Sequence, residues 1–80
     1  MQKIEHIGIA VKDLEKAEKL YEQLLGTVSY KREKVESEHV ITSFFRSATA
    51  KIELLQATSE ESAIHKFIVK KGEGICVIII

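Results

Sequence analysis

Residues 4–11 have the sequence Ile-Glu-His-Ile-Gly-Ile-Ala-Val, in which two kinds of side chain alternate. Strict alternation predicts a β-strand, because successive side chains of a strand point to opposite faces. Ile7, Ile9 and Val11 share one face, which suits packing against a helix. The opposite face is small and nearly flat, and His6 is its imidazole. An imidazole on a face of small residues is well placed for a ligand to approach it.

The rest of the chain predicts a helix, three strands, a second helix and a last strand. Asp13 suits the N-cap of the first helix, and Gly26 suits the residue after its end. The segment Thr58-Ser59-Glu60-Glu61 has the form of a capping box and predicts the start of the second helix. The expected elements are a strand at residues 3–11, a helix at 14–25, strands at 27–35, 39–46 and 51–57, a helix at 59–70 and a strand at 75–80. This order predicts an α+β fold.

Composition narrows the function classes. The 80 residues suffice for one small domain, and the net charge is +0. Nucleic-acid-binding domains usually carry a basic patch, and none is evident in the sequence, so we expect no nucleic-acid partner. The single cysteine forms no intrachain disulfide, which suits a reducing compartment. We find no secretory signal and no apolar run long enough to span a membrane, so the sequence predicts a cytoplasmic protein.

A second candidate ligand lies on the predicted strand at residues 51–57. This strand carries Glu53 in a setting similar to that of His6. An imidazole and a carboxylate together suit borderline and hard divalent ions. His6 and Glu53 would therefore make half of a metal site. Both also have simpler interpretations, as a histidine at a strand end and as a solvated strand residue.

Several stretches resemble a known superfamily. The run from His6 to Ala17 (HIGIAVKDLEKA), followed by Leu24-Leu25-Gly26, is similar to the start of the vicinal-oxygen-chelate superfamily. That superfamily includes glyoxalase I, bleomycin-resistance proteins and extradiol dioxygenases. The segment Lys51-Ile52-Glu53-Leu54-Leu55, the residues around Ser62-Ala63-Ile64 and the segment Gly72-Glu73-Gly74-Ile75 are more specific and resemble methylmalonyl-CoA epimerase.

The resemblance implies a fold and an activity. The fold has two strand-helix-three-strand (βαβββ) modules that line a cleft holding a divalent metal. Epimerases of this kind interconvert the epimers of methylmalonyl-CoA by removing and returning the proton alpha to the thioester. By position, His6 matches the first metal ligand and Glu53 the second. The ion could be Co, Mn, Ni, Zn or Mg, and the substrate an acyl-CoA. A CoA site needs basic residues at its rim, for which Lys3, Arg46 and Lys51 are candidates.

The sequence also departs from the pattern of these epimerases. Cys76 and Val77 stand where the family usually has two histidines, the second of them the third ligand. Thr42 stands where some epimerases carry a catalytic glutamate. We therefore expect a single half domain over residues 1–80, with a first module at about 3–57, a connecting helix at 59–70 and the truncated start of a second module at 75–80. No catalytic base is evident, so we expect an incomplete active site.

Two arrangements of the missing half remain open. In a two-fold homodimer, the small faces of two first strands could meet and combine His6 and Glu53 from both chains. Alternatively, residues 75–80 could fold back onto the edge of the first strand, as a second module's first strand would, and exclude the partner. The chain could then be a non-catalytic or truncated module that dimerises, or a small-molecule binding protein of the bleomycin-resistance kind.

The remaining chemistry-bearing residues have structural interpretations. His39 lies beside a polar turn and His65 lies among lysines on the second predicted helix, so both suit the surface. Cys76 lies in an apolar run, which favours an inert buried thiol. The three phenylalanines, Phe44, Phe45 and Phe67, are expected in the core rather than in a stacking platform.

Overall fold

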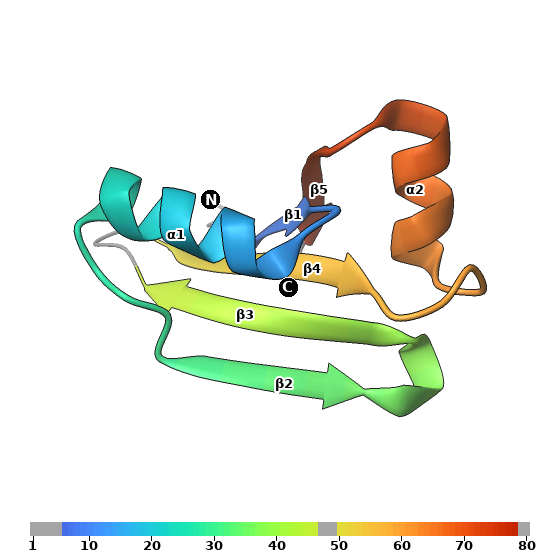
Figure 1. Ribbon diagram of the computed structural model, residues 1–80, viewed down its shortest axis with the longest axis horizontal. Coiled ribbons are helices and arrows are strands. Elements are labelled where there is room, and N and C mark those ends of the chain that lie inside the picture. Colours follow the sequence, from blue (N-terminus) through green and yellow to red (C-terminus); the bar gives the residue numbers. More distant parts are fainter. Residues whose placement is uncertain (1–5, 47–49, 79–80) are drawn as a thin grey trace, which may run out of the picture.

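The computed structural model describes residues 6–46 and 50–78. Within these ranges one five-stranded sheet and two α-helices form the fold (Figure 1). The elements are β1 (His6–Ala10), α1 (Leu14–Leu25), β2 (Lys31–Val35), the 3₁₀ turn η1 (Glu36–Glu38), β3 (Val40–Arg46), β4 (Lys51–Ala57), α2 (Ala63–Lys71) and β5 (Gly74–Ile78). The predicted βαβββ module, followed by a helix and a strand, is confirmed.

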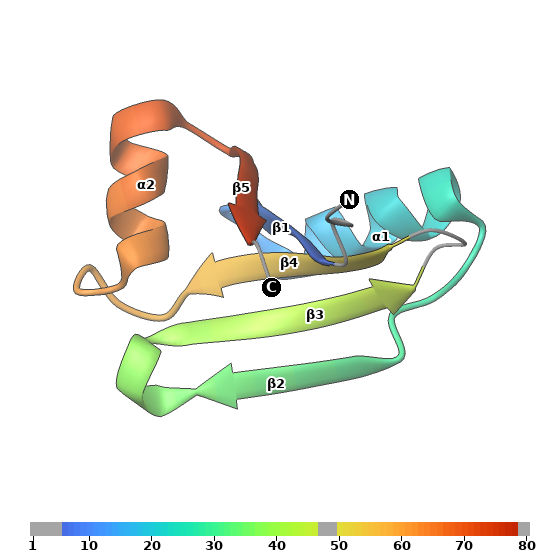
Figure 2. The ribbon, with the colours of Figure 1, turned by 180° about the vertical axis from the view of Figure 1, so that it is seen from behind.

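The sheet has the strand order β2-β3-β4-β1-β5. The first strand, β1, lies inside the sheet, parallel to β4 and antiparallel to β5. Strands β2, β3 and β4 form an antiparallel meander beside it (Figure 2). The register places His6 opposite Lys51 of β4 and Gly8 opposite Glu53. Residues 1–5, which include Lys3, and residues 47–49 and 79–80 lie outside the described ranges.

The pairing of β1 with β5 tests one of the two arrangements of the missing half. Gly74–Ile78 occupies one edge of β1. The expectation that the last strand folds back onto β1 is therefore confirmed. The two-fold arrangement, in which the small faces of two first strands meet, stays a prediction, because β4 and β5 pair with the edges of β1 and not with its small face.

Helix α1 covers one face of the sheet and makes the core with it (Figures 1 and 2). The central side chains are Val11, Leu14, Phe45 and Leu54, of which Phe45 and Leu54 are 0% exposed. Alternation along the strands puts these residues on the helix-covered face and leaves His6 and Glu53 for the opposite face. We call the opposite face the open face of the sheet.

Both ends of α1 follow the sequence prediction. The Asp13 carboxylate accepts a hydrogen bond from the Lys16 N–H at 3.2 Å, as an N-cap does. The N–H of Leu14 donates to the Gln56 side chain at 2.6 Å, which ties the first turn to β4. Gly26 ends the helix with φ of 67°, in the left-handed region that glycine adopts without strain.

Two element boundaries differ from the prediction. Strand β2 begins at Lys31 and not at Thr27, because the chain uses residues 27–30 to cross from the helix layer to the sheet edge. Helix α2 begins at Ala63, and its N-cap is Ser62, whose hydroxyl accepts from the Ile64 N–H at 3.1 Å. The predicted capping box at residues 58–61 is wrong, because residues 59–62 form a turn closed by the Ser62 N–H and the Ser59 carbonyl.

Neither helix of the described ranges combines the length and the apolar character that crossing a membrane requires.

Candidate functional site

The fold brings the two predicted ligands into contact. His6 begins β1 and Glu53 lies in the middle of β4, and the parallel register sets them diagonally across adjacent strands. The Nδ1–H of His6 donates a hydrogen bond to Glu53 Oε2 at 2.7 Å. Their side chains are only 21% and 12% exposed. A contact between residues 47 positions apart in sequence is a consequence of the fold and not of local structure.

The neighbours of this pair along β1 are small. Gly8 lies opposite Glu53 on β1, and Ala10 follows it with an exposed fraction of 0%. Gly8 has no side chain, so nothing on β1 projects over the Glu53 carboxylate from that position. The β1 side of the pair therefore carries no large side chain beside Glu53.

The geometry of the His6–Glu53 contact can be compared with that of metal ligands. With the proton on Nδ1, the Nε2 lone pair would be the one that binds an ion, and Glu53 would back the histidine without ligating. The separation of 2.7 Å is also a few tenths of an ångström shorter than the spacing of two ligands on one ion. With bonds of about 2.1 Å at right angles, that spacing is about 3.0 Å. For both side chains to ligate the same ion, Nδ1 would have to lose its proton and move slightly away from Oε2.

The described residues supply no more than this pair. No group of three or more His, Cys, Asp or Glu side chains that could hold a metal occurs among them. Cys76 lies opposite Gly8 in the register of β5, but its side chain lies outside the described part of the structure. A tightly bound ion needs more donors than two, so the remaining ligands would have to come from elsewhere.

Thr42 lies on the same open face but offers no acid. It pairs with Leu55 of β4 and lies two residues along β3 from Phe44, which pairs with Glu53. Thr42 is 5% exposed. A hydroxyl at this position cannot serve as a general base at neutral pH in the way that a carboxylate does. No catalytic residue is therefore assigned on this face.

The other sequence candidates are distributed over the molecule. His39 is a half-exposed residue that contacts the Glu61 carboxylate at 3.2 Å. His65, predicted to face solvent, is half-buried and lines a hollow of about 500 Å³ between α2 and the ends of β1 and β4. Among the three phenylalanines, Phe45 is in the core as predicted, whereas Phe44 and Phe67 are only half-buried.

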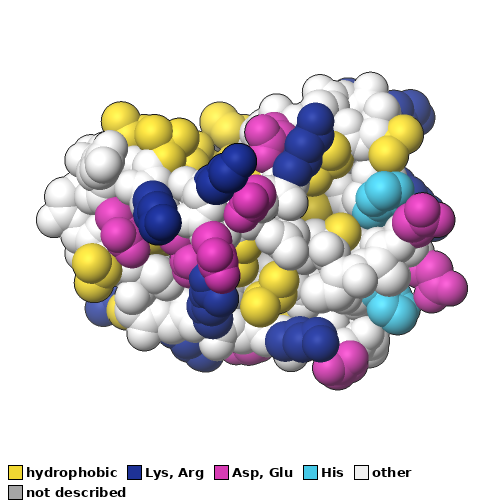
Figure 3. Space-filling view, in the orientation of Figure 1, with side chains coloured by type: hydrophobic (Ala, Val, Ile, Leu, Met, Phe, Trp, Pro, Cys, Tyr) yellow, Lys and Arg dark blue, Asp and Glu magenta, His cyan; other side chains and the backbone are white. Residues whose placement is uncertain are grey.

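The hollows of the described surface lie away from the pair. A second hollow, of about 470 Å³, lies between α1 and the start of β5 and includes Leu20, Tyr21 and Glu73. Figure 3 shows apolar side chains gathered over α1 on this side of the molecule, where Leu20 and Leu24 are 54% and 68% exposed. His6 and Glu53 line neither of these hollows and belong to the open face.

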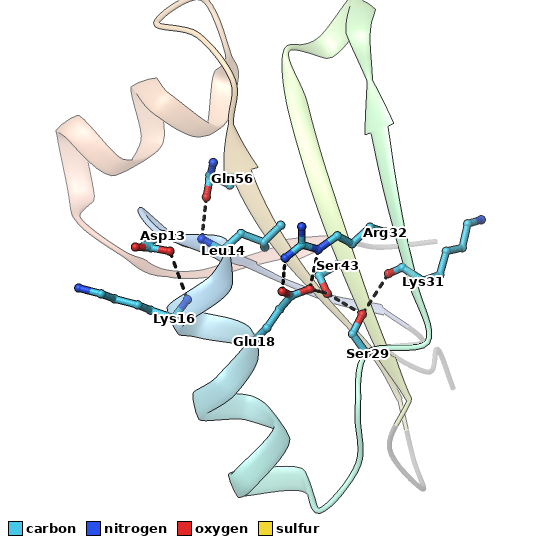
Figure 4. Close-up of polar contacts among 9 residues, drawn as sticks. All are labelled: Asp13, Leu14, Lys16, Glu18, Ser29, Lys31, Arg32, Ser43 and Gln56. Atoms are coloured by element: carbon cyan, nitrogen blue, oxygen red, sulfur yellow. Dashed lines mark hydrogen bonds and ion pairs between the residues drawn. The ribbon is translucent and has the colours of Figure 1, made fainter.

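A partly buried polar cluster on the helix-covered face was not predicted. Glu18 of α1 accepts hydrogen bonds from Arg32 of β2 and from the fully buried hydroxyl of Ser43 on β3 (Figure 4). The Arg32 guanidinium holds the pKa of the Glu18 carboxyl below its ordinary value, against the effect of burial. The sequence carried a signal for this cluster, because Glu18 follows Leu14 by four residues on the apolar stripe of α1.

The sequence matches the family described as the Glyoxalase/Bleomycin resistance protein/Dioxygenase superfamily over residues 5–78. The uncharacterized protein YqjC of Bacillus subtilis (strain 168) is 37% identical over 75 residues, which cover 94% of this chain and 54% of YqjC. A hypothetical protein from Bacillus halodurans C-125 is 42% identical with a TM-score of 0.85, over 92% of this chain and 54% of its own.

Methylmalonyl-CoA epimerase from Mycobacterium tuberculosis superposes with a TM-score of 0.84 at 32% identity, over 91% of this chain and 50% of its own. The chain thus spans about half the length of the relatives that it matches. The match over residues 5–78, together with the βαβββ module, shows that this chain belongs to the Glyoxalase/Bleomycin resistance protein/Dioxygenase superfamily.

Proposed function

We propose that this chain is the metal-holding first module of an epimerase-type site that acts on an acyl-CoA. The observation that carries the proposal is the contact between His6 Nδ1 and Glu53 Oε2, 2.7 Å apart on the open face. Support also comes from the similarity to methylmalonyl-CoA epimerase at 32% identity. His6 and Glu53 would hold a divalent ion, and that ion would stabilise the negative charge that develops on a thioester oxygen.

The module would contribute binding and not proton transfer. Epimerisation breaks the C–H bond alpha to the thioester, leaves an enolate and returns a proton to its opposite side. A base must accept that proton, and Thr42 is a hydroxyl where some epimerases have a glutamate. The base and the remaining metal ligands would come from a second module or from another copy of the chain. Residues 75–80 would then be the start of that second module.

Metal binding by the purified chain tests the proposal directly. We expect Co²⁺ and Mn²⁺ to bind in native mass spectrometry and calorimetry, and the His6→Ala variant to bind at least about tenfold more weakly, since it removes one of two donors. Native masses would also report whether the chain is a dimer.

The chain offers a matched control. His39 contacts Glu61 at 3.2 Å, which makes a second histidine–carboxylate pair, but the Glu61 side chain is 80% exposed. His39→Ala should leave metal binding unchanged. Equal metal affinity in wild type and in the His6→Ala variant would exclude the proposed ligand pair.

Exchange at the substrate tests the chemistry separately. Incubation of the metal-loaded chain with methylmalonyl-CoA in D₂O should give little deuterium at the alpha carbon if the base is missing. Rapid exchange by the chain alone would contradict the proposal that this module supplies metal binding but no base. Binding of an apolar ligand without any metal requirement would instead favour a bleomycin-resistance-like binding protein.

A further inference from the structure

One corner of the open face combines aromatic rings with exposed positive charge. The ring centroids of Tyr30 and Phe44 are 6.2 Å apart, and the Arg46 guanidinium lies 5.1 Å from the Tyr30 centroid. Lys51 lies directly opposite Arg46 across β3 and β4. We call Tyr30, Phe44, Arg46 and Lys51 the basic-aromatic corner.

The register of β3, β4 and β1 places this corner next to the His6–Glu53 pair. Arg46, Lys51 and His6 form one row across β3, β4 and β1, since each is opposite the next. Phe44 and Glu53 form the adjacent row. Residues directly opposite each other on neighbouring strands project from the same face. The basic-aromatic corner and the candidate metal ligands are therefore continuous on the open face.

The two cations of the corner are available to a ligand. Among the described residues, Arg46 and Lys51 form no ion pair with any carboxylate, and both are exposed. The nearby Lys31 differs, because its Nζ contacts Glu33 at 3.0 Å. In Figure 4 the Lys31 side chain extends away from the Glu18 cluster, to which Arg32 points, so adjacent residues of β2 project to opposite faces.

Tyr30 is the more accessible of the two rings, because the Lys31 Nζ lies 5.4 Å from the Phe44 centroid. Tyr30 is 49% exposed, although tyrosine rings bury readily, and Phe44 is half-buried. Exposed aromatic rings stack on the flat faces of nucleobases, and unpaired guanidinium and ammonium groups bind phosphates. A ligand that carries a planar base and phosphates matches both halves of the corner.

We infer that the basic-aromatic corner binds the nucleotide end of a CoA-type ligand, with the adenine ring on Tyr30 and Phe44 and the phosphates on Arg46 and Lys51. The acyl-CoA class is taken from the proposed function. Strands are about 4.8 Å apart, so the rings lie roughly two to three strands, about 10–14 Å, from the β1 backbone at His6. The pantetheine arm of the ligand would span that distance to the thioester.

The probe is 3′-phosphoadenosine 5′-phosphate, titrated into the metal-free chain and followed by ¹H–¹⁵N NMR. We expect saturable shifts at the four corner residues. Arg46→Gln and Tyr30→Leu should each raise the Kd about tenfold, by loss of a phosphate contact and of a stacking surface. Lys70→Gln removes an exposed lysine on α2 and should leave the Kd unchanged.

The spectra also report whether each variant is folded. Arg46→Lys keeps the charge but loses the planar group over Tyr30, so it should show an intermediate Kd. Shifts that map elsewhere, or inorganic phosphate binding as tightly as the nucleotide, would overturn the inference. The His6→Ala variant should lose metal but keep the nucleotide, so failure of the corner and failure of the proposed metal site give different results.

Discussion

The partly buried Glu18 carboxylate allows a quantitative test of how α1 is fixed to the sheet. Arg32 Nε donates to Glu18 Oε2 at 2.9 Å, its Nη2 donates to Oε1, and Ser43 Oγ donates to Oε2 at 2.5 Å. Three elements, α1, β2 and β3, therefore meet at one carboxylate. The Glu18→Ala variant removes all three contacts without altering the apolar core.

The expected loss follows from burial. Hydrogen bonds to charged groups contribute about 1.5–3 kcal/mol each when buried, and much less when exposed. The Glu18 side chain is 13% exposed, but Arg32 is 44% exposed, so solvent weakens the ion pair. Ser43 is fully buried, and its hydroxyl would keep only the Ser29 hydroxyl as a neighbour. We expect Glu18→Ala to lower the free energy of unfolding by about 2 kcal/mol at pH 7, and Glu18→Gln by about half as much.

The effect should depend on pH with a defined sign. Because Arg32 lowers the pKa of Glu18 from its ordinary value of 4.5, the folded state favours the charged carboxylate. This contribution is complete above pH 4.5 and is lost as the pH falls through the lowered pKa. Urea unfolding followed by circular dichroism, at pH 7 and at steps below pH 5, should show the gap between wild type and Glu18→Gln closing in acid.

A double-mutant cycle separates the ion pair from the hydroxyl contact. Arg32→Gln alone should cost less than Glu18→Ala, and the two losses should not add. A gap between wild type and Glu18→Gln that stays constant from pH 7 into acid would refute the assignment of a charged, Arg32-stabilised carboxylate. So would additive losses in the double variant.

Three further changes test the core and the ends of α1 by urea or thermal unfolding. Leu54→Ala should lower the free energy of unfolding by about 2–5 kcal/mol, because Leu54 is 0% exposed in the centre of the core; a loss below about 1 kcal/mol would mean that the site is not close-packed. Gly26→Ala should cost about 1 kcal/mol through its φ of 67° alone, since no atom lies within 4 Å of the added Cβ, and Gly26→Asn should cost less. Asp13→Ala should cost about 1 kcal/mol by removing the acceptor for the Lys16 N–H, whereas Asp13→Asn should retain most of the stability.

Local chemistry explains why much of the fold was predictable. The alternation in residues 4–11 and in β4, and the Asp13 and Gly26 signals around α1, are each contained in a short window of sequence. Where several local signals compete, prediction was less reliable. Thr58 and Ser62 both precede a plausible helix, and the turn that places the start at Ala63 depends on backbone hydrogen bonds that residue type alone does not specify.

In the candidate site, too, the sequence indicated the residue types, whereas their arrangement depends on the assembled fold. The sequence suggested His6 and Glu53 separately, but only the parallel register of β1 and β4 brings their side chains to 2.7 Å. The exposure of Phe44 was missed because adjacent phenylalanines look equally suited to a core. Phe45 faces α1, whereas Phe44 faces the other way, beside Glu53. Which face a covering helix occupies is a property of the assembled fold.

The position of β1 inside the sheet has a consequence for folding kinetics. This strand leaves the ribosome before the other described strands, yet its hydrogen-bonded neighbours β4 and β5 follow after more than half of the described sequence has been made. Closing such long loops is entropically costly and slows folding. The antiparallel meander of β2, β3 and β4 has short connections and can form first, with α1 docked on it. Until β1 inserts beside β4, the polar backbone edge of β4 remains available to other chains, which makes this interval the one most exposed to aggregation.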